Sequence, residues 1–265
     1  MKCKTLYLAI LILPFIFTSC NKVIELKLGN DSGKLVIEGN ITNTSAPQYI
    51  RLSRNVPFTS NNVYPAVSGA TVTVSDSKGN NYFFTEGADG VYINNNLTGI
   101  SGETYTMTVI TAGITYTATS VMPPAVPLDS ISSKKNDFKS NHNQREISVH
   151  FRDQPGVTNQ YRFLMYVNHT QVDVIFAIND DFTDGRYVNL DLIENKTDIL
   201  PGDVINVEMQ CVDKPVFTYW YTLMRQQFDS PGGGVAPSNP PTNITPACLG
   251  YFSAHTTQFM TLVTK

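Results

Sequence analysis

The chain is poor in charged side chains, and it lacks any cluster of basic ones. It has 19 Lys and Arg residues against 22 Asp and Glu residues, so its formal net charge is −3 at pH 7. Proteins that bind nucleic acid, or that dock by charge on anionic lipid, carry basic runs or patches. A mildly acidic chain without a basic run therefore indicates neither a nucleic-acid partner nor electrostatic binding to a membrane surface.

Long hydrophobic runs are also scarce, and the only one lies at the start of the chain. Residues 6–17 are almost entirely apolar and follow two basic residues, Lys2 and Lys4. A basic start, an apolar stretch of about 7–15 residues and a small-residue cleavage site are typical of a secretory signal rather than a membrane span. No later stretch reaches the roughly 18 apolar residues that a transmembrane helix needs.

The small residues that end this run are followed by a cysteine, Cys20. This arrangement resembles the lipobox of bacterial lipoproteins, and the resemblance implies cleavage before Cys20 and acylation of that residue. Residues 1–19 are then the signal peptide and residues 20–33 a tether, with the bilayer contacted through the acyl chains. The alternative is an ordinary signal peptide that happens to end near a cysteine.

Cysteine is scarce as well. Four are present, and removal of Cys3 with the signal and acylation of Cys20 leave Cys211 and Cys248. In the oxidising space that an exported chain meets, these two could form a disulfide, or they could remain two small buried thiols. Their spacing does not match zinc sites, which use close pairs of Cys or His.

Catalytic motifs are missing too. The chain contains no G-x-S-x-G nucleophile elbow, no P-loop and no G-x-G-x-x-G after a strand. No H-E-x-x-H occurs, and the histidines do not pair at a spacing of four; they are His142, His150, His169 and His255. We therefore expect a protein that is not an enzyme and that holds no cofactor. Carboxylate pairs for glycoside hydrolysis meet only in the fold, so a hydrolase stays open as a minor alternative.

One acidic cluster deserves comparison with calcium loops. Asp180, Asp181 and Asp184 precede Gly185. The calcium-loop spacing fails, because a loop that began at Asp180 would put Phe182 at its third position. We expect a solvated turn and no metal.

What the chain has in abundance is short alternating strands. Over residues 104–109, Tyr105, Met107 and Val109 alternate with threonines, and residues 70–75 and 114–119 show the same period of two. That period is typical of half-buried strands. Turn residues separate the runs at short intervals, so residues 34–122 predict an immunoglobulin- or transthyretin-like β-sandwich.

The proline-rich residues 123–127 interrupt this pattern, because proline cannot donate to a β-ladder. We interpret them as a linker to a second, β-rich domain at residues 128–265. A polar loop is expected at residues 132–144, a strand at residues 204–209, and a final pair of strands at residues 248–253 and 258–263.

One helix is predicted in the second domain, after Asp213 and Pro215. Its apolar stripe falls at helical spacing, and Pro215 suits a first helical turn. The stripe consists of Phe217, Trp220, Met224 and Phe228. A strand is the alternative here, because the segment is rich in aromatics.

Three consecutive aromatics in this segment, Tyr219, Trp220 and Tyr221, cannot all be buried by one helix or strand. Exposed Tyr and Trp side chains are common anchors for a partner or a sugar ring. We interpret Trp220 as a core residue, and Tyr219 and Tyr221 as candidate contacts for a partner. The alternative is that all three pack on the second domain.

Several short motifs, taken in order, resemble a known family. They are Cys20 in its lipobox, residues 34–39 (KLVIEG), 68–74 (SGATVTV), 90–92 (GVY), 102–105 (GETY), the proline segment, 243–244 (NI) and 250–253 (GYFS). The chain is similar to the Bacteroidota lipoproteins of domain of unknown function 4249. The resemblance implies a cell-envelope protein without assigned catalysis, whose genes commonly lie beside TonB-dependent receptors.

The sequence and the resemblance leave three hypotheses for the function of this protein. The leading hypothesis is a non-catalytic accessory or ligand-binding subunit of a TonB-dependent outer-membrane receptor, with an unidentified small-molecule or glycan ligand. The second is a surface adhesin or glycan-binding module independent of a transporter, and the third is a hydrolase. The expected location is the outer membrane, lipid-anchored, with the periplasmic and cell-surface leaflets both open because only Glu25 supplies an acid soon after Cys20.

Overall fold

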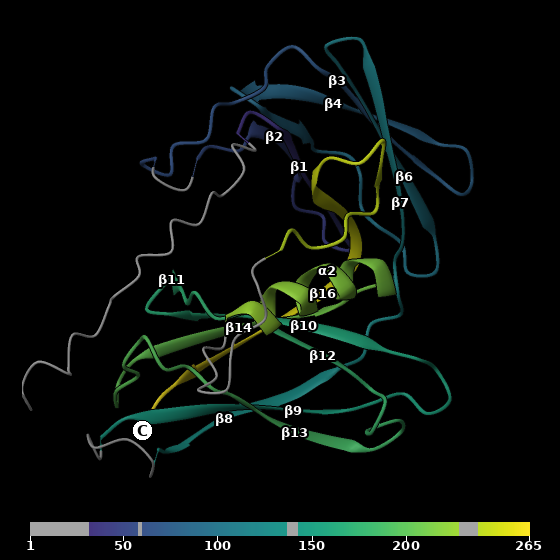
Figure 1. Cartoon of the computed structure of the whole chain (residues 1–265). Coiled ribbons are helices and arrows are strands. Elements are labelled where there is room, and N and C mark those ends of the chain that lie inside the picture. The colour runs from purple at the N-terminus through teal and green to yellow at the C-terminus, as the bar shows by residue number, and fades with distance from the viewer. Residues whose placement is uncertain (1–31, 58–59, 137–142, 228–237) are drawn as a thin grey trace, which may run out of the picture. The chain divides into compact units, whose positions relative to one another are not determined.

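The computed structural model describes residues 32–57, 60–136, 143–227 and 238–265, which form one compact unit (Figure 1). This part of the chain is built almost entirely of β-strands, with one helix, as the sequence predicts. No helix within it is long and apolar enough to cross a membrane. The predicted signal peptide, Cys20 and nearly all of the tether lie outside the described residues.

The strands fall into a 13-stranded sheet, which folds over on itself, and a separate three-stranded sheet. The first seven strands are β1 (Leu35–Thr42), β2 (Gln48–Arg54), β3 (Thr71–Asp76), β4 (Asn81–Ala88), β5 (Val91–Asn94), β6 (Thr104–Thr111) and β7 (Ile114–Val121). The next seven are β8 (Leu128–Lys135), β9 (Arg145–Arg152), β10 (Gln160–Val167), β11 (Thr170–Gln171), β12 (Phe176–Asn179), β13 (Tyr187–Leu192) and β14 (Val204–Cys211). The helix α2 (Lys214–Gln226), β15 (Ile244–Thr245) and β16 (Leu249–Val263) complete the order.

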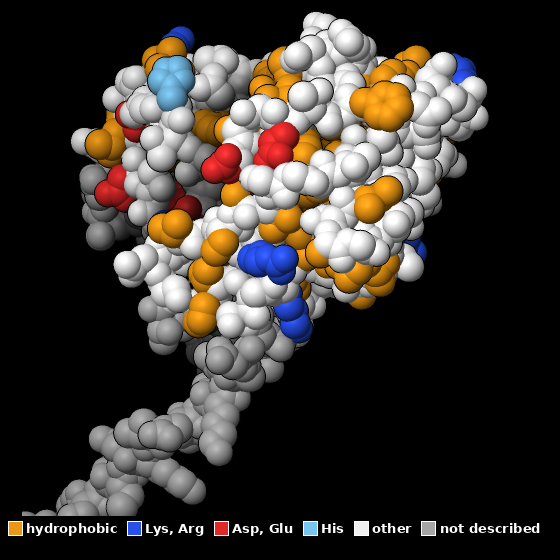
Figure 2. All heavy atoms as spheres, turned by 90° about the horizontal axis from the view of Figure 1, so that it is seen from above, with side chains coloured by type: hydrophobic (Ala, Val, Ile, Leu, Met, Phe, Trp, Pro, Cys, Tyr) orange, Lys and Arg blue, Asp and Glu red, His pale blue; other side chains and the backbone are white. Residues whose placement is uncertain are grey.

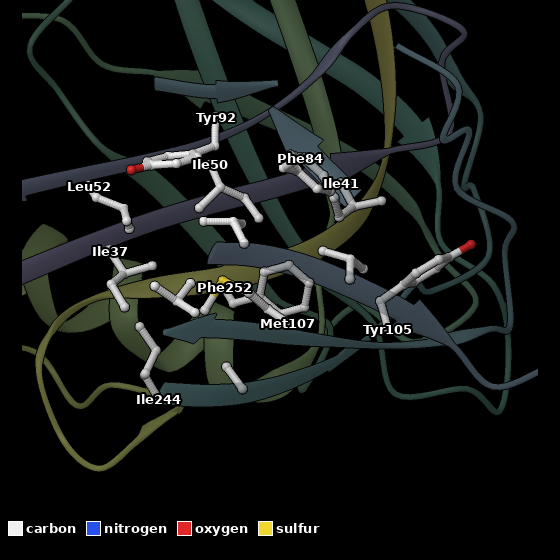
Figure 3. Close-up of a cluster of buried hydrophobic side chains, with 14 of the residues drawn as sticks. Ile37, Ile41, Ile50, Leu52, Phe84, Tyr92, Tyr105, Met107, Ile244 and Phe252 are labelled. Atoms are coloured by element: carbon white, nitrogen blue, oxygen red, sulfur yellow. The ribbon is translucent and has the colours of Figure 1, made fainter. Parts of the chain in front are cut away.

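The first hydrophobic core lies between β1, β2 and β5 on one side and β3, β4, β6 and β7 on the other. The alternation predicted for β6 is confirmed, because Tyr105, Met107 and Val109 are all buried while the intervening threonines are not. Figure 3 shows side chains from both layers converging, with Phe252 of β16 beside Met107. Burial of one face of each layer makes this part of the chain a β-sandwich.

The second core lies between the three-stranded sheet β13-β9-β8 and the neighbouring strands β10, β12 and β14. Ile147, Val149 and Phe151 of β9 point into it, opposite Tyr161 and Phe163 of β10. The two aromatic strands meet there, with the Phe151 and Tyr161 ring centroids 4.8 Å apart. The predicted polar loop at residues 132–144 is wrong in its first part, since residues 132–135 belong to edge strand β8.

One long strand, β16, joins the two halves. It pairs in parallel with β1 through residues 249–255 and antiparallel with β14 through residues 256–263. The predicted pair of final strands is therefore wrong: residues 254–257 carry no Gly, Pro, Asn or Asp that would turn the chain, and the strand runs through. Because residues 244–254 contribute to the first core, that core is not confined to residues 34–122.

Close contact between β1 and β16 requires glycine. Gly250 has φ +95°, and a Cβ atom there would lie 2.0 Å from the carbonyl oxygen of Ile37. At Gly39 a Cβ atom would lie 2.8 Å from the Phe252 ring. The missing side chains thus let the last strand pack against the first.

The predicted helix is confirmed as α2. Asp213 caps its first turn by accepting a hydrogen bond from the Val216 N–H at 3.1 Å, and Pro215 lies in that turn. The second carboxylate oxygen of Asp213 accepts hydrogen bonds from Ser120 and from the Val121 N–H, which ties the helix start to β7. The helix lies against β10 and β12 (Figure 1). The stripe residue Phe228 lies outside the described residues.

Candidate ligand-binding groove

A groove of about 790 Å³ lies on the outer face of the large sheet. It crosses β1, β2, β10, β14 and β16 and ends at α2. Its aromatic lining consists of Tyr49, Tyr166, Trp220, Tyr251 and Phe259, and its charged lining of Glu38, Arg51, Arg162 and Glu208. Small-molecule sites commonly have volumes of about 300–1,000 Å³ and combine apolar walls with a few convergent polar groups.

Strand alternation puts these side chains in the groove. On β10, Tyr161, Phe163 and Met165 point into the second core, so Arg162, Leu164 and Tyr166 point the other way. The same rule applies on β1, where Ile37 is buried and Glu38 is exposed. An arginine in the middle of the apolar run at residues 161–167 was a signal in the sequence that strand analysis could have used.

The centre of the groove is a stacked pair, Arg162 and Trp220. The guanidinium carbon of Arg162 lies 3.5 Å from the centroid of the Trp220 ring system, in cation–π geometry. Arg162 Nη1 donates a hydrogen bond to Gln210 Oε1 at 3.1 Å. No ion pair to Arg162 occurs among the described residues. Burial lowers the pKa of its guanidinium, while the nearby charges of Glu208 and several tyrosines act in the opposite direction. Most of its five N–H donors are therefore available to a ligand.

A polar network along the floor of the groove holds the neighbouring side chains in place. Glu208 Oε1 accepts hydrogen bonds from Gln210 Nε2 and from Thr257 Oγ1, each at 2.7 Å. The Tyr251 hydroxyl donates to Asn40 Oδ1 at 3.3 Å, which connects β16 to β1 across the groove. Arg162 joins this network through its hydrogen bond to Gln210. The network therefore holds hydrogen-bond donors and acceptors together with one negative and one positive charge.

The buried histidine of the groove, His255, is too weak a base for proton transfer at neutral pH. His255 lines the groove, and its Nδ1 lies 2.9 Å from Ser253 Oγ. Burial, assisted by the charge of Arg162, lowers the pKa of His255 to about 3. A base this weak is about four units below the value that suits proton transfer at neutral pH. The pair is therefore a poor nucleophile–base couple.

A second serine–histidine arrangement lies on the outer face of the three-stranded sheet. Ser132 Oγ is 2.7 Å from His150 Nε2, and His150 Nδ1 is 2.6 Å from Asn189 Oδ1. The order of groups resembles a nucleophile, a base and an orienting residue. Ser132 and Asn189 are exposed and neither lines the groove, so this row lies open to solvent.

The candidate partner residues Tyr219 and Tyr221 do not share a surface. Tyr219 packs on Trp220 and Tyr251, with ring centroids 5.3 and 5.0 Å away, and burial raises the pKa of its hydroxyl. Tyr221 is 40% exposed and stacks on Phe217. Neither residue lines the groove, whereas Trp220 between them does. Their role in partner binding stays a prediction.

The remaining cysteines are free thiols in the structure. Cys211 is buried in the second core, and Cys248 packs against the first. Desolvation raises the pKa of both, that of Cys248 to about 11, so neither is a reactive thiolate at neutral pH. Of the two arrangements that the sequence left open, the structure shows the unpaired one.

The acidic cluster is only partly a solvated turn. Asp181 and Asp184 are exposed, as expected, but Asp180 is 4% exposed and lies beside Asp153, which is fully buried. Asp153 follows β9 and lies 27 residues before Asp180, so no local spacing rule could have joined them.

Comparison with known proteins supports the family and little else. A search of curated proteins gives no match. Among solved structures, the Yersinia pseudotuberculosis adhesin InvE matches at 18% identity and a TM-score of 0.23, over 69% of this chain and 57% of the adhesin chain. A two-domain fibronectin type III segment of chicken tenascin matches at 15% identity and a TM-score of 0.21, over 68% of this chain and 91% of that segment. Similarities this distant carry no functional argument.

A family model, described as domain of unknown function DUF4249, matches residues 21–259. That match begins just after Cys20 and includes both cores, the helix and most of β16. Since it spans nearly the whole chain, the protein belongs to the DUF4249 family.

Proposed function

We propose that this protein is a non-catalytic, lipid-anchored protein of the outer membrane that binds a ligand in its groove and serves a TonB-dependent receptor as an accessory subunit. The groove carries the proposal: a cavity of about 790 Å³ in which Arg162 lies over Trp220 with donors free for a ligand. The lipid anchor at Cys20 and the receptor partnership rest on the signal sequence and on the family resemblance.

The groove favours a polar ligand that has both hydrogen-bonding groups and an apolar surface. Two arginines and two glutamates line it, so it does not select for a high charge of either sign. Aromatic side chains beside polar groups suit sugar rings or peptide side chains. The weak basicity of His255 and the exposed position of the Ser132 row support a binding role rather than hydrolysis.

Ligand binding can be tested through the single tryptophan of the chain, Trp220. A ligand that contacts the groove should change its fluorescence, and soluble oligosaccharides and short peptides are the probes. Tyr49→Ala and Tyr166→Ala should weaken binding about 30-fold if either is an anchor worth about 2 kcal/mol. Tyr187→Ala is the matched control, since Tyr187 lies on β13 of the other sheet.

The receptor partnership requires a separate measurement. Native protein purified from outer membranes should bring down a large barrel, and Tyr221→Ala should reduce the yield of that barrel while Tyr187→Ala leaves it unchanged. Tyr221 is 40% exposed and Tyr187 is 46% exposed, so a difference between the two variants reflects where each tyrosine lies rather than how exposed it is. If wild-type protein recovers no barrel, the accessory role is wrong. Glycan binding in the groove without a barrel would instead favour the adhesin hypothesis.

A further inference from the structure

Three carboxylates from two segments of the chain meet beside the second core. Asp153 follows β9, and Asp180 and Asp184 follow β12. One oxygen from each of the three lies within 4.8 Å of the other two. This cluster is distinct from the groove, because Arg162 and its neighbours lie on the opposite face of β10.

Burial makes this arrangement costly without a cation. Asp153 is 0% exposed and Asp180 is 4% exposed. Buried carboxylates are normally paired with a basic group or bound to a metal, and like charges this close oppose each other. The ion pairs found in the described part of the chain all lie elsewhere.

Hydrogen bonds orient these carboxylates without neutralising them. Asp153 accepts from the Tyr161 hydroxyl and from the Gly185 N–H, the latter at 3.0 Å. Asp180 Oδ2 accepts from the Asn159 N–H at 2.7 Å, and Asp184 Oδ1 accepts from the Gly156 N–H at 2.7 Å. In the described chain, Asp180 Oδ1 and Asp184 Oδ2 have no hydrogen-bond donor, so each can ligate a cation.

A second observation points to a ligand at this place. Asn159 is 3% exposed, and its side-chain oxygen Oδ1 is buried without a hydrogen-bond partner. Asn159 lies directly beside Asp180, because its N–H donates to Asp180 Oδ2 at 2.7 Å and its carbonyl oxygen accepts from the Asp180 N–H at 3.2 Å. The hydroxyl of Thr183, in the loop between Asp180 and Asp184, is also buried and unpartnered. Unsatisfied buried oxygens are rare and require an explanation such as a bound ion.

We propose that Asp153, Asp180, Asp184 and the Asn159 side chain form a calcium site that joins the ends of β9, β10 and β12. Calcium takes oxygen ligands at about 2.3–2.6 Å, so two ligand oxygens on one ion can be up to about 5 Å apart, which accommodates 4.8 Å. Magnesium dehydrates reluctantly and is seldom held by a cage made only of protein oxygens. A set of three carboxylates and one amide oxygen therefore favours calcium over magnesium.

The test uses the full chain, purified in detergent, freed of metal with a chelator and titrated with CaCl₂ or MgCl₂ up to about 10 mM. That concentration is tenfold above the weakest class of calcium modules. Isothermal titration calorimetry measures the dissociation constant, and thermal unfolding measures stabilisation. We expect calcium to raise the melting temperature by about 5 °C or more at saturation, and magnesium to have a much smaller effect.

Three isosteric variants locate the site. Asp180→Asn and Asp184→Asn keep an oxygen to accept the Asn159 and Gly156 N–H groups, and each should weaken calcium binding at least about 100-fold. Removal of one like charge should leave the calcium-free protein as stable as the wild type, or more stable. Asp181→Asn is the matched control, because Asp181 is an exposed neighbour that bonds only Asn179 in the described chain.

Three results would overturn the proposal: no calcium binding by the wild type, equal stabilisation by calcium and magnesium, or unchanged calcium binding in both ligand variants. The first two need no variant, so the test stands even if a substitution prevents folding.

Discussion

The stacked pair at the centre of the groove yields a prediction with a magnitude. Arg162 lies 3.5 Å from the Trp220 centroid, and burial lowers the pKa of its guanidinium, which indicates that the charge is withdrawn from water. Cation–π contacts contribute about 0.5–1 kcal/mol at exposed sites and about 2 kcal/mol or more when desolvated. We therefore expect a coupling energy of about 2 kcal/mol between these two side chains.

A double-mutant cycle isolates this term. Arg162→Met, Trp220→Leu and the double variant are unfolded in urea and followed by circular dichroism, because the only tryptophan of the chain is lost in two of them. The chain offers a matched cycle in Arg152→Met and Tyr187→Leu. There the guanidinium lies 5.8 Å from the ring centroid and both residues are exposed, so the coupling should be about 0.5 kcal/mol.

Equal coupling energies in the two cycles would refute the reasoning. A value below about 0.5 kcal/mol for Arg162 and Trp220 would mean that the guanidinium is not held over the ring in solution. The positive charge of the groove would then be mobile rather than pre-positioned for a ligand, and the ligand-binding proposal would lose its main support.

Two further predictions concern the strand that joins the cores. Gly250→Ala should lower the free energy of unfolding in urea by about 3 kcal/mol or more, because the new Cβ would overlap the Ile37 carbonyl. The control is Gly113→Ala, where φ is also positive but the space is open, and it should lower the free energy of unfolding by only about 1 kcal/mol. Because unfolded His255 titrates near pH 6.5 and the folded residue near 3, stability should fall as the pH drops through this window, by about 2–3 kcal/mol at pH 4.5. His255→Gln should lose less stability between pH 7 and 4.5, and an unchanged loss would contradict a buried, neutral imidazole.

Local rules in the sequence were enough for most of the individual elements. Alternation identified β6, and the strand predicted at residues 204–209 lies within β14, because a strand exposes every second side chain to the same environment. The helix was found from its apolar stripe and Pro215, since capping and helical spacing act within a few residues. Three consecutive aromatics could not all be buried, and Tyr221 is the exposed one.

Longer-range features escaped these rules. The single strand β16 looked like two strands, because the change of partner from β1 to β14 leaves no mark in its alternation. Edge strand β8 looked like a loop, since serines and lysines face solvent along it.

The sequence by itself determined the all-β class, the one helix and the family of this protein, and it contains no local catalytic motif. Only the tertiary structure decided which side chains meet. Arg162 reaches Trp220 across 58 residues, and Asp153 reaches Asp180 across 27. Such contacts depend on strand order and register, which arise from the burial of whole faces against one another rather than from any local pattern. The groove and the proposed calcium site are therefore properties of the fold.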